Sequence, residues 1–443
     1  MKIVIAGAGE VGTHLAKLFS NEDQDIIIMD PDERKLALLD NYNLLTYHGS
    51  ATSFNCLKDV RVGKADIFVA VTPFEARNLM ACQLAKSMGA KKTVARIDNS
   101  EYLAKQHQAY FSNLGVDYLI YPEHLAASEM LTSLRMPWVR NCFEMFNSQL
   151  IVLGVRLRDN ATIVGKQLKD LSAMSQLLHV SAIKRNRETI IPRGDDYILS
   201  GDIAYIATTL DQIDEVRKAC GKSTLTIEKI LIMGGSEIAE QLARKIGDKY
   251  HVKIIEADLA RCEELSGELP NCNIVHGDAR DTDLLEEEGI SDYDVFVALT
   301  SSTEANILGC MMAKEHGVKK TIAQVENIQY INEAEALNIG TIINKQLLAS
   351  SRIVQIMLDC DVDNARCLAL SDAEVAEIVI KDNARVTKAE VKNLRIPTGM
   401  TIAGMVRDGV GQLVKGNTKL ESGDHVVVFC LAGSIHKIEK VFS

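Results

Sequence analysis

Short apolar runs alternate with amphipathic segments along the first third of the chain. The runs have strand length and few polar interruptions, a pattern typical of parallel strands that are covered on both faces. The segments between them have helical periodicity, for example over residues 75–88. This alternation predicts a doubly wound parallel sheet, with its ligand crevice at the carboxyl ends of the strands. The expected strands cover residues 3–5, 25–30, 43–47, 66–72, 92–96 and 115–122.

A glycine-rich turn joins the first expected strand to the first expected helix. It has the spacing G-x-G-x-x-G, and the second strand ends about twenty residues later in Asp30. The first glycine permits a tight turn, the second lets backbone N–H groups approach a pyrophosphate, and the third allows close helix packing. Asp30 would accept hydrogen bonds from ribose hydroxyls. The pattern predicts a dinucleotide site, and the alternative is a glycine-rich turn without a ligand. The turn comprises Gly7, Ala8, Gly9, Glu10, Val11 and Gly12.

The pattern changes after residue 140. Residues 149–156 alternate apolar and polar positions only loosely, and residues 162–171 suggest a short helix. Strand-like segments at 180–185 and 204–207 are joined through turn signals such as Ser200-Gly-Asp202. We expect a small α+β module of about 80 residues here.

The first pattern then returns in register. Residues 229–239 align with residues 2–12, His276-Gly-Asp-Ala279 matches His48-Gly-Ser-Ala51, and the strand at 294–300 matches that at 66–72. A match between two segments that stays in register over about a hundred residues is not expected by chance. A second small module closes the chain, so the predicted order is sheet, small module, sheet, small module.

The second glycine turn departs from the fingerprint. Ser236 replaces the middle glycine, where a Cβ obstructs the approach of a pyrophosphate, and Ala239 replaces the last one. Binding there should be weaker, altered or absent, and the alternative is a domain retained only for assembly. Glu256 is placed to hold a ribose and Asp278 to meet an adenine edge. The turn itself contributes Gly234, Gly235, Ser236, Glu237 and Ile238.

Composition narrows the possible functions. The 443 residues suffice for three or four domains, and 49 basic against 60 acidic residues give a net charge of −11, so we expect no nucleic-acid partner. No apolar run approaches the roughly 18 residues of a membrane span, and we expect no secretory signal. The ten cysteines are scattered without zinc spacing, which favours reduced cytosolic thiols and no metal site.

No catalytic set accompanies either expected crevice. A dehydrogenase needs a proton donor or acceptor near the nicotinamide, and no such group, nucleophile elbow or H-E-x-x-H motif is visible. Arg96 ends the fifth strand and would pair with a phosphate or with a neighbouring subunit, whereas its counterpart is Gln324. Glu10 disfavours the extra charge of a longer polyphosphate, and Asp30 repels a 2′-phosphate. We therefore expect NAD(H), rather than ATP or NADP, at the first site.

With the duplication in view, the chain resembles the TrkA family of peripheral potassium-uptake regulators. The resemblance rests on the first glycine turn, Asp30, the repeated His-Gly loop, Ala95-Arg96 and the closing segment from Ile396 to Asp424. It implies two Rossmann-like RCK-N domains (RCK being the nucleotide-binding unit of this family), each followed by a small α+β RCK-C domain. The implied ranges are 1–136, 140–222, 227–358 and 370–443.

The resemblance implies a non-enzymatic, cytoplasmic subunit peripheral to the membrane. Dimers or tetramers of such chains form a gating ring on a membrane potassium transporter or channel, and bound nucleotide controls uptake. Residues implied at the first site are Gly7 to Val11, Asp30, Ser50, Ala51, Thr72 and Arg96, and at the second Gly234 to Ile238, Glu256, Asp278 and Thr300. NAD(H) would bind the first, and ATP, ADP or NAD(H) the second.

Three alternatives remain open at this level. An NAD-dependent oxidoreductase is the competing class, and regulation of another cation transporter differs only in the partner. The helix expected at 123–136 and its counterpart near 345–358 resemble the crossover helices that link RCK subunits, but their apolar stripes also fit an intradomain core.

Overall fold

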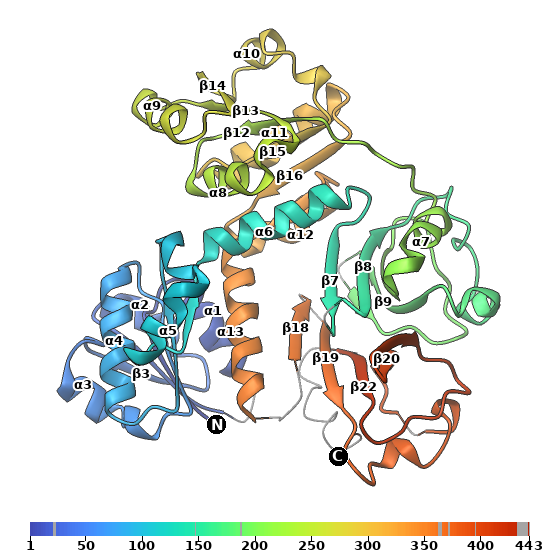
Figure 1. The fold of residues 1–443 in the computed structure, drawn as a ribbon, viewed down its shortest axis with the longest axis horizontal. Helices are drawn as coiled ribbons and strands as arrows, with labels where there is room; N and C mark the ends of the chain where they lie inside the picture. The colour runs from blue at the N-terminus through green and yellow to red at the C-terminus, as the bar shows by residue number, and fades with distance from the viewer. Residues whose placement is uncertain are drawn as a thin grey trace. The chain divides into compact units, whose positions relative to one another are not determined.

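The computed structural model describes residues 1–20, 24–146, 148–186, 188–361, 366–370, 373–394, 396–431 and 442. Its first sheet has six parallel strands in the order β3-β2-β1-β4-β5-β6. The part of the chain that contains this sheet is blue to cyan in Figure 1. A doubly wound parallel sheet was predicted, and its order has β1 paired with both β2 and β4. The strands are β1 Lys2–Ala6, β2 Asp25–Asp30, β3 Leu45–His48, β4 Ile67–Ala70, β5 Lys92–Arg96 and β6 Tyr118–Ile120.

Helices connect the strands of this sheet, as the periodicity predicts. Between β5 and β6 the chain forms a 3-10 turn, Ser100–Leu103, and a separate α-helix, because Ala104 between them is extended. The helices are α1 Glu10–Ser20, α2 Glu33–Ala37, α3 Phe54–Asp59, α4 Glu75–Ser87, α5 Lys105–Asn113 and α6 Pro122–Arg135.

The second parallel sheet repeats the first, with the order β14-β13-β12-β15-β16-β17. Its strands are β12 Lys229–Met233, β13 His251–Glu256, β14 Cys272–His276, β15 Val295–Ala298, β16 Lys320–Gln324 and β17 Thr341–Ile343. Its helices are α8 Glu237–Ile246, α9 Leu259–Glu268, α10 Thr282–Glu287, α11 Thr303–Glu315 and α12 Ile331–Ala336. The long helix α13, Lys345–Asp361, follows.

Each small module is an antiparallel sheet. The first has the order β10-β9-β11-β8-β7, from strands β7 Asn141–Met145, β8 Leu150–Arg156, β9 His179–Arg185, β10 Glu188–Ile190 and β11 Ile203–Thr208, followed by α7 Ile213–Ala219. The second has the order β18-β19-β22-β20-β21, from β18 Arg366–Leu370, β19 Ala373–Val379, β20 Met400–Arg407, β21 Val410–Leu413 and β22 His425–Leu431. Residues 432–441 and 443 of the expected last module lie outside the described residues.

Two details of the first small module differ from the sequence prediction. Turns occupy residues 162–165 where a helix was expected, and a 3-10 helix spans Leu168–Met174 instead. Gly165 has φ = 78°, a left-handed conformation that interrupts an α-helix. The short strands β7 and β10 were not predicted, because their alternation is too brief to show in the sequence.

One core is shared by the two small modules. Leu150, Val152 and Tyr205 of the first pack in the same buried cluster as Val375 and Phe429 of the second. Burial of these apolar side chains holds the modules together, because each fully buried large side chain contributes about 1.5–3 kcal/mol.

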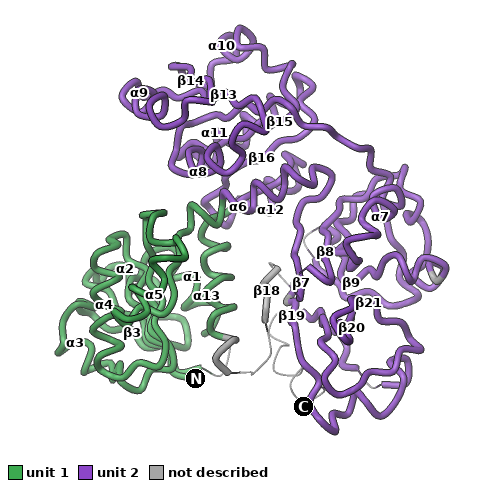
Figure 2. The backbone as a smooth tube through the Cα atoms, viewed as in Figure 1, with its two compact units in different colours: residues 1–126, 344–361 green, residues 127–343, 362–443 purple. Residues whose placement is uncertain are grey.

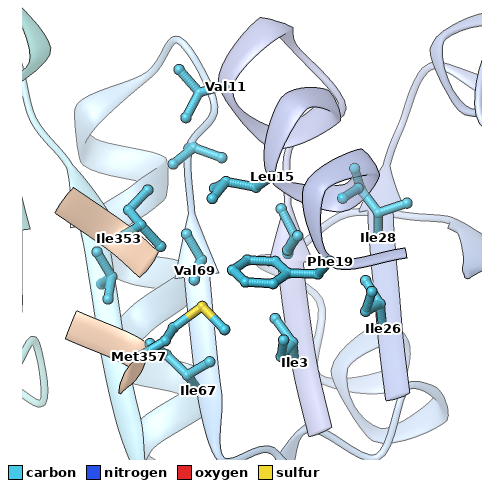
Figure 3. Close-up of a cluster of buried hydrophobic side chains, with 14 of the residues drawn as sticks. Ile3, Val11, Leu15, Phe19, Ile26, Ile28, Ile67, Val69, Ile353 and Met357 are labelled. Atoms are coloured by element: carbon cyan, nitrogen blue, oxygen red, sulfur yellow. The ribbon is translucent and has the colours of Figure 1, made fainter. Parts of the chain in front are cut away.

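The chain forms two compact units (Figure 2). The first comprises residues 1–126 and 344–361, and the second comprises residues 127–343 and 362–443. Helix α13 therefore belongs to the unit of the first parallel sheet, although it follows the second sheet in sequence. Ile353 and Met357 of α13 are buried beside Ile3, Leu15 and Phe19 (Figure 3).

No helix in the described part of the chain is long and apolar enough to cross a membrane.

Candidate functional site

The first glycine turn is shaped by its first and last glycines. Gly7 has φ = 110°, which favours glycine, and a Cβ on Gly12 would overlap the carbonyl oxygen of Gly7. A Cβ on Gly9, by contrast, would meet no atom within 4 Å. The space above Gly9 is therefore open, as the approach of a phosphate to the N-terminus of α1 requires.

Asp30 organises this turn from the end of β2. The Ala8 N–H donates to Asp30 Oδ2 at 2.7 Å, and the Asp32 N–H donates to Asp30 Oδ1 at 2.8 Å. The side chain is buried, with 6% exposure. Each carboxylate oxygen accepts more than one hydrogen bond, so these contacts leave acceptor capacity for a ribose hydroxyl.

Thr72 and Arg96 are linked through Asn78 of α4. The Thr72 hydroxyl donates to Asn78 Oδ1 at 2.6 Å, and the Asn78 amide donates to the Arg96 carbonyl oxygen at 2.9 Å. Asn78 is 1% exposed, so it fixes the carboxyl ends of β4 and β5 side by side. The second half repeats this link through Asn306, between Thr300 and the carbonyl oxygen of Gln324. Neither asparagine was among the predicted site residues.

The N-terminus of α13 adds charged and polar groups to the first crevice. Lys345 Nζ lies 3.2 Å from Glu123 Oε1, and Arg96 lies 3.8 Å from the same oxygen. Gln346 hydrogen-bonds Glu10, the first residue of α1. The second oxygen of Glu123 is buried and has no hydrogen-bond partner among the described residues. An acceptor buried without a partner is costly, which favours a donor supplied by a ligand.

The remaining first-site residues lie on the loop after β3. The Gly49 N–H donates to the Asp30 carbonyl oxygen at 3.1 Å, which brings the following Ser50 and Ala51 to the same edge of the sheet. The Ser50 hydroxyl hydrogen-bonds Thr52 at 2.9 Å and is exposed. The structure thus gathers every residue predicted for the first site at the carboxyl edge of one sheet.

The second crevice is an open cavity of about 570 Å³ at the carboxyl ends of β12, β13 and β15. Six predicted residues line it, whereas Glu237 and Ile238 do not, because Glu237 is exposed and Ile238 is buried under α8. The volume falls within the range of about 300–1,000 Å³ that small-ligand sites occupy. The predicted lining residues are Gly234, Gly235, Ser236, Glu256, Asp278 and Thr300.

The acid of the second crevice repeats the role of Asp30. The Gly235 N–H donates to Glu256 Oε2 at 2.5 Å, and the Asp258 N–H donates to Glu256 Oε1 at 2.8 Å. Ser236 stands where the first turn has its middle glycine. Its hydroxyl is buried and has no hydrogen-bond partner within the described chain. The cavity therefore presents a polar atom that a ligand can satisfy.

Two arginines of the second crevice were missed from the sequence. Arg261 of α9 donates to the Gly235 carbonyl oxygen at 2.8 Å and pairs with Glu240 at 2.8 Å. Arg280 pairs with Asp278 at 2.6 Å, and its hydrogen bonds lower the pKa of the Asp278 carboxyl. Asp278 thus stays ionised beside a cation, and both arginines line the cavity. Neither follows a recognisable motif, so only the folded loop reveals them.

Comparison with known proteins decides the family. The model of the TrkA-N domain matches residues 3–122 and 230–345, and that of the TrkA-C domain matches residues 152–221 and 375–443. The chain belongs to the TrkA family. It is 31% identical to the Trk system potassium uptake protein TrkA of Haemophilus influenzae, over 100% of this chain and 98% of that protein. It is 30% identical to the TrkA homolog of Archaeoglobus fulgidus, over 100% of both.

Solved structures share the fold of this TrkA family member. The GsuK RCK domain matches 100% of this chain and 94% of its own, with a TM-score of 0.62 at 14% identity. The GsuK channel bound to NAD matches 100% of this chain and 78% of its own, with the same TM-score and identity. These matches confirm the predicted architecture of Rossmann-like domains, each followed by a small α+β domain.

Proposed function

We propose that this chain is a cytoplasmic, nucleotide-sensing regulatory subunit of a membrane potassium transporter or channel. The relatives of full-length similarity are named as Trk potassium uptake proteins. The observation that carries the sensing role is the first crevice, where α13 brings Lys345 to Glu123 and Gln346 to Glu10 of the glycine turn. A ligand bound there contacts a segment that directly follows the second sheet in sequence, so occupancy bears on both halves of the chain.

NAD(H) is the ligand proposed for the first crevice. Support comes from the open space at Gly9, the acceptor capacity of Asp30 and the unpartnered oxygen of Glu123. The similar fold of GsuK has been solved with NAD bound. Gly7 to Val11 would hold the pyrophosphate and Asp30 the ribose, while Ser50, Ala51, Thr72 and Arg96 would complete the contacts.

ATP, ADP or NAD(H) is proposed for the second crevice. Its supporting features are the cavity, the unpartnered Ser236 hydroxyl and the arginines Arg261 and Arg280. Gly234 to Ile238, Glu256, Asp278 and Thr300 would frame the ligand. Two arginines favour a terminal phosphate more strongly here than at the first crevice, where Glu10 opposes added negative charge.

Regulation follows from differential binding rather than from chemistry. Copies of the chain are proposed to assemble as a dimer or tetramer into a ring on the membrane partner. A nucleotide shifts the ring between two geometries only if it binds one of them more tightly, and a tenfold preference corresponds to about 1.4 kcal/mol.

The test is calorimetric titration of the wild type, Asp30→Ala and Glu256→Ala with NADH, NAD, ATP and ADP. Asp30→Ala should weaken NADH binding at least tenfold. The substitution removes both the acceptor for the ribose and the hydrogen bond from the Ala8 N–H that holds the glycine turn. Glu256→Ala should leave the NADH affinity of the first crevice unchanged and should weaken whichever of ATP, ADP or NAD(H) binds the second crevice. Equal NADH affinity in wild type and Asp30→Ala would contradict the first assignment.

Function itself is tested separately, by co-purification with membrane proteins and by growth of a deletion strain at limiting potassium. The expected partner is a potassium transporter or channel, and growth should fail at low potassium. Sustained oxidation of NADH with a small carbonyl substrate, or co-purification with a transporter for another cation only, would overturn the proposal.

A further inference from the structure

A cluster of positive charges lies around the turn between α12 and β17, in the second compact unit. It contains Lys314 and Lys320 from the second sheet and its helices, and five cations from the first small module and its flanking segments. The chain as a whole is acidic, so this concentration of one sign is local. We call these residues the basic cluster: Arg140, Arg156, Arg158, Lys184, Lys222, Lys314 and Lys320.

Uncharged oxygens accept the hydrogen bonds of Lys320, Lys314 and Arg140. Lys320 Nζ is bonded to the carbonyl oxygens of Pro137 and Val139 at 3.2 Å each and to Thr341 Oγ1 at 3.0 Å. Lys314 donates to the carbonyl oxygen of Asn338, and Arg140 donates to Asn338 Oδ1 at 2.9 Å.

One carboxylate forms an ion pair within the described part of the basic cluster. Glu335 lies 2.8 Å from Lys184 Nζ, and its carbonyl oxygen accepts from Arg156 at 3.3 Å. The carboxyl ends of α11 and α12 add partial negative charge, but each helix end is equivalent to about half an elementary charge. Seven cations are therefore only partly neutralised by the protein itself.

The positive charges of the basic cluster therefore repel one another. Burial, and then the positive charge of neighbouring arginines, lowers the pKa of Arg140, Lys222 and Lys314. Burial, Arg140 and Lys314 together lower the pKa of Lys320 to about 7. Like charges held this close are unfavourable, and a bound anion would relieve the repulsion.

We propose that the basic cluster binds an anion carrying two or more phosphate groups, at a site separate from both glycine-turn crevices. The separation follows from the sheet, because Lys320 begins β16 and so lies at the amino edge, whereas the crevice lies at the carboxyl edge. Arginine forks match the paired oxygens of phosphate, and several cations in one place favour a polyvalent over a monovalent anion.

The location of the site gives it a structural consequence. Arg140, Arg156 and Lys184 belong to the first small module, whereas Lys314, Glu335 and Asn338 belong to the second parallel sheet and its helices. An anion bridging the two groups strengthens the contact between these domains.

The chain offers a local reporter for a test. Trp138 is the single tryptophan of the sequence and stands between the two residues whose carbonyl oxygens hold Lys320. Titration of the full chain with inorganic pyrophosphate should give a saturable change in tryptophan emission. Chloride at matched ionic strength should give none.

Variants locate the binding. Arg156→Gln combined with Arg158→Gln should weaken the pyrophosphate response about tenfold or more, because two charge-assisted contacts are lost. The control is Lys166→Gln combined with Lys169→Gln. It removes the same charge from the same module but outside the basic cluster, so the pyrophosphate response should not change. Arg158 is exposed, so Arg158→Gln alone serves if the double variant does not fold. An absent or unsaturable response in wild type, or equal affinity in wild type and the cluster variants, would overturn the proposal.

Discussion

At the scale of single residues, the glycines of the first turn differ in what they contribute: Gly12 to the packing of the turn, and Gly9 to the space left for a ligand. In the present geometry of the first turn a Cβ on Gly12 would overlap the Gly7 carbonyl oxygen, whereas Gly9 has no neighbour within 4 Å of an added Cβ. The second half carries Ala239 at the position of Gly12, so a side chain there requires the turn to adjust rather than preventing the fold. It carries Ser236 at the position of Gly9 and still forms its turn and α8. A side chain at the middle position is therefore compatible with the fold.

Gly9→Ala should leave thermal stability unchanged within about 0.5 kcal/mol and should weaken NADH binding at least tenfold, because its methyl group occupies the open space above the turn. Differential scanning calorimetry and isothermal titration measure the two effects. Gly267→Ala in α9, also without neighbours to its new Cβ, is the control for binding and should leave NADH affinity unchanged. Full NADH affinity in Gly9→Ala would mean that no phosphate approaches this glycine.

Lys320 makes stability depend on pH. Burial lowers its pKa to about 7 in the folded chain, against about 10.5 when unfolded. Between these values the unfolded chain holds a proton that the folded chain lacks, so this group makes stability rise with pH from 7 to 10.5. Below pH 7 both states are protonated and the contribution is constant.

Lys320→Met should remove this dependence while preserving much of the side-chain volume. Urea unfolding at pH 7 and pH 9.5, in chloride buffer, should show a larger gain at high pH for wild type than for the variant. Parallel pH profiles for the two proteins would contradict the lowered pKa.

At the scale of elements, α13 connects the two halves of the chain. Its residues Ala349, Ile353 and Met357 are buried with the apolar face of α1. From the sequence, the helix could be either a crossover helix or part of the core of the second sheet domain. The structure places it in the compact unit of the first sheet. The role of linking subunits, which the family resemblance implies for this helix, stays a prediction.

Ile353→Ala should destabilise the first compact unit by about 2–5 kcal/mol, as expected for loss of a fully buried aliphatic side chain. Hydrogen exchange should accelerate at amides of β1 and α1 and remain slow in β12 and α8. Leu308→Ala on α11, where the side chain is 63% exposed, is the control and should have little effect. Faster exchange confined to the second sheet would contradict the packing of α13 on the first.

At the scale of the whole molecule, net charge shapes the proposed association with a membrane partner. The charge of −11 opposes non-specific binding to nucleic acid and favours the Lys- and Arg-rich loops on the cytoplasmic side of membrane proteins. The basic cluster is a local exception within an acidic chain, and its partial burial keeps it from dominating the surface.

The proposed complex should therefore weaken with salt. Co-purification of the membrane partner should fall as ionic strength rises from about 0.05 to 0.5 M, since the Debye length shrinks from about 14 to 4 Å. Retention of the partner without change across this range would indicate that apolar contacts, rather than charge, hold the complex.

The sequence alone determined the alternation of strands and helices, the duplication and the family, because glycine spacing, strand-terminal acids and hydrophobic periodicity are local features that repeat in register. The individual site residues remain predictions, but Asp30 and Glu256 occupy the same place in both crevices. Only the tertiary structure decided where α13 packs, that Lys345 and Gln346 reach the first crevice, and that seven cations gather around residues 335–341. These contacts join segments up to about 340 residues apart. No local pattern encodes them, since they depend on which apolar faces find each other when the chain folds.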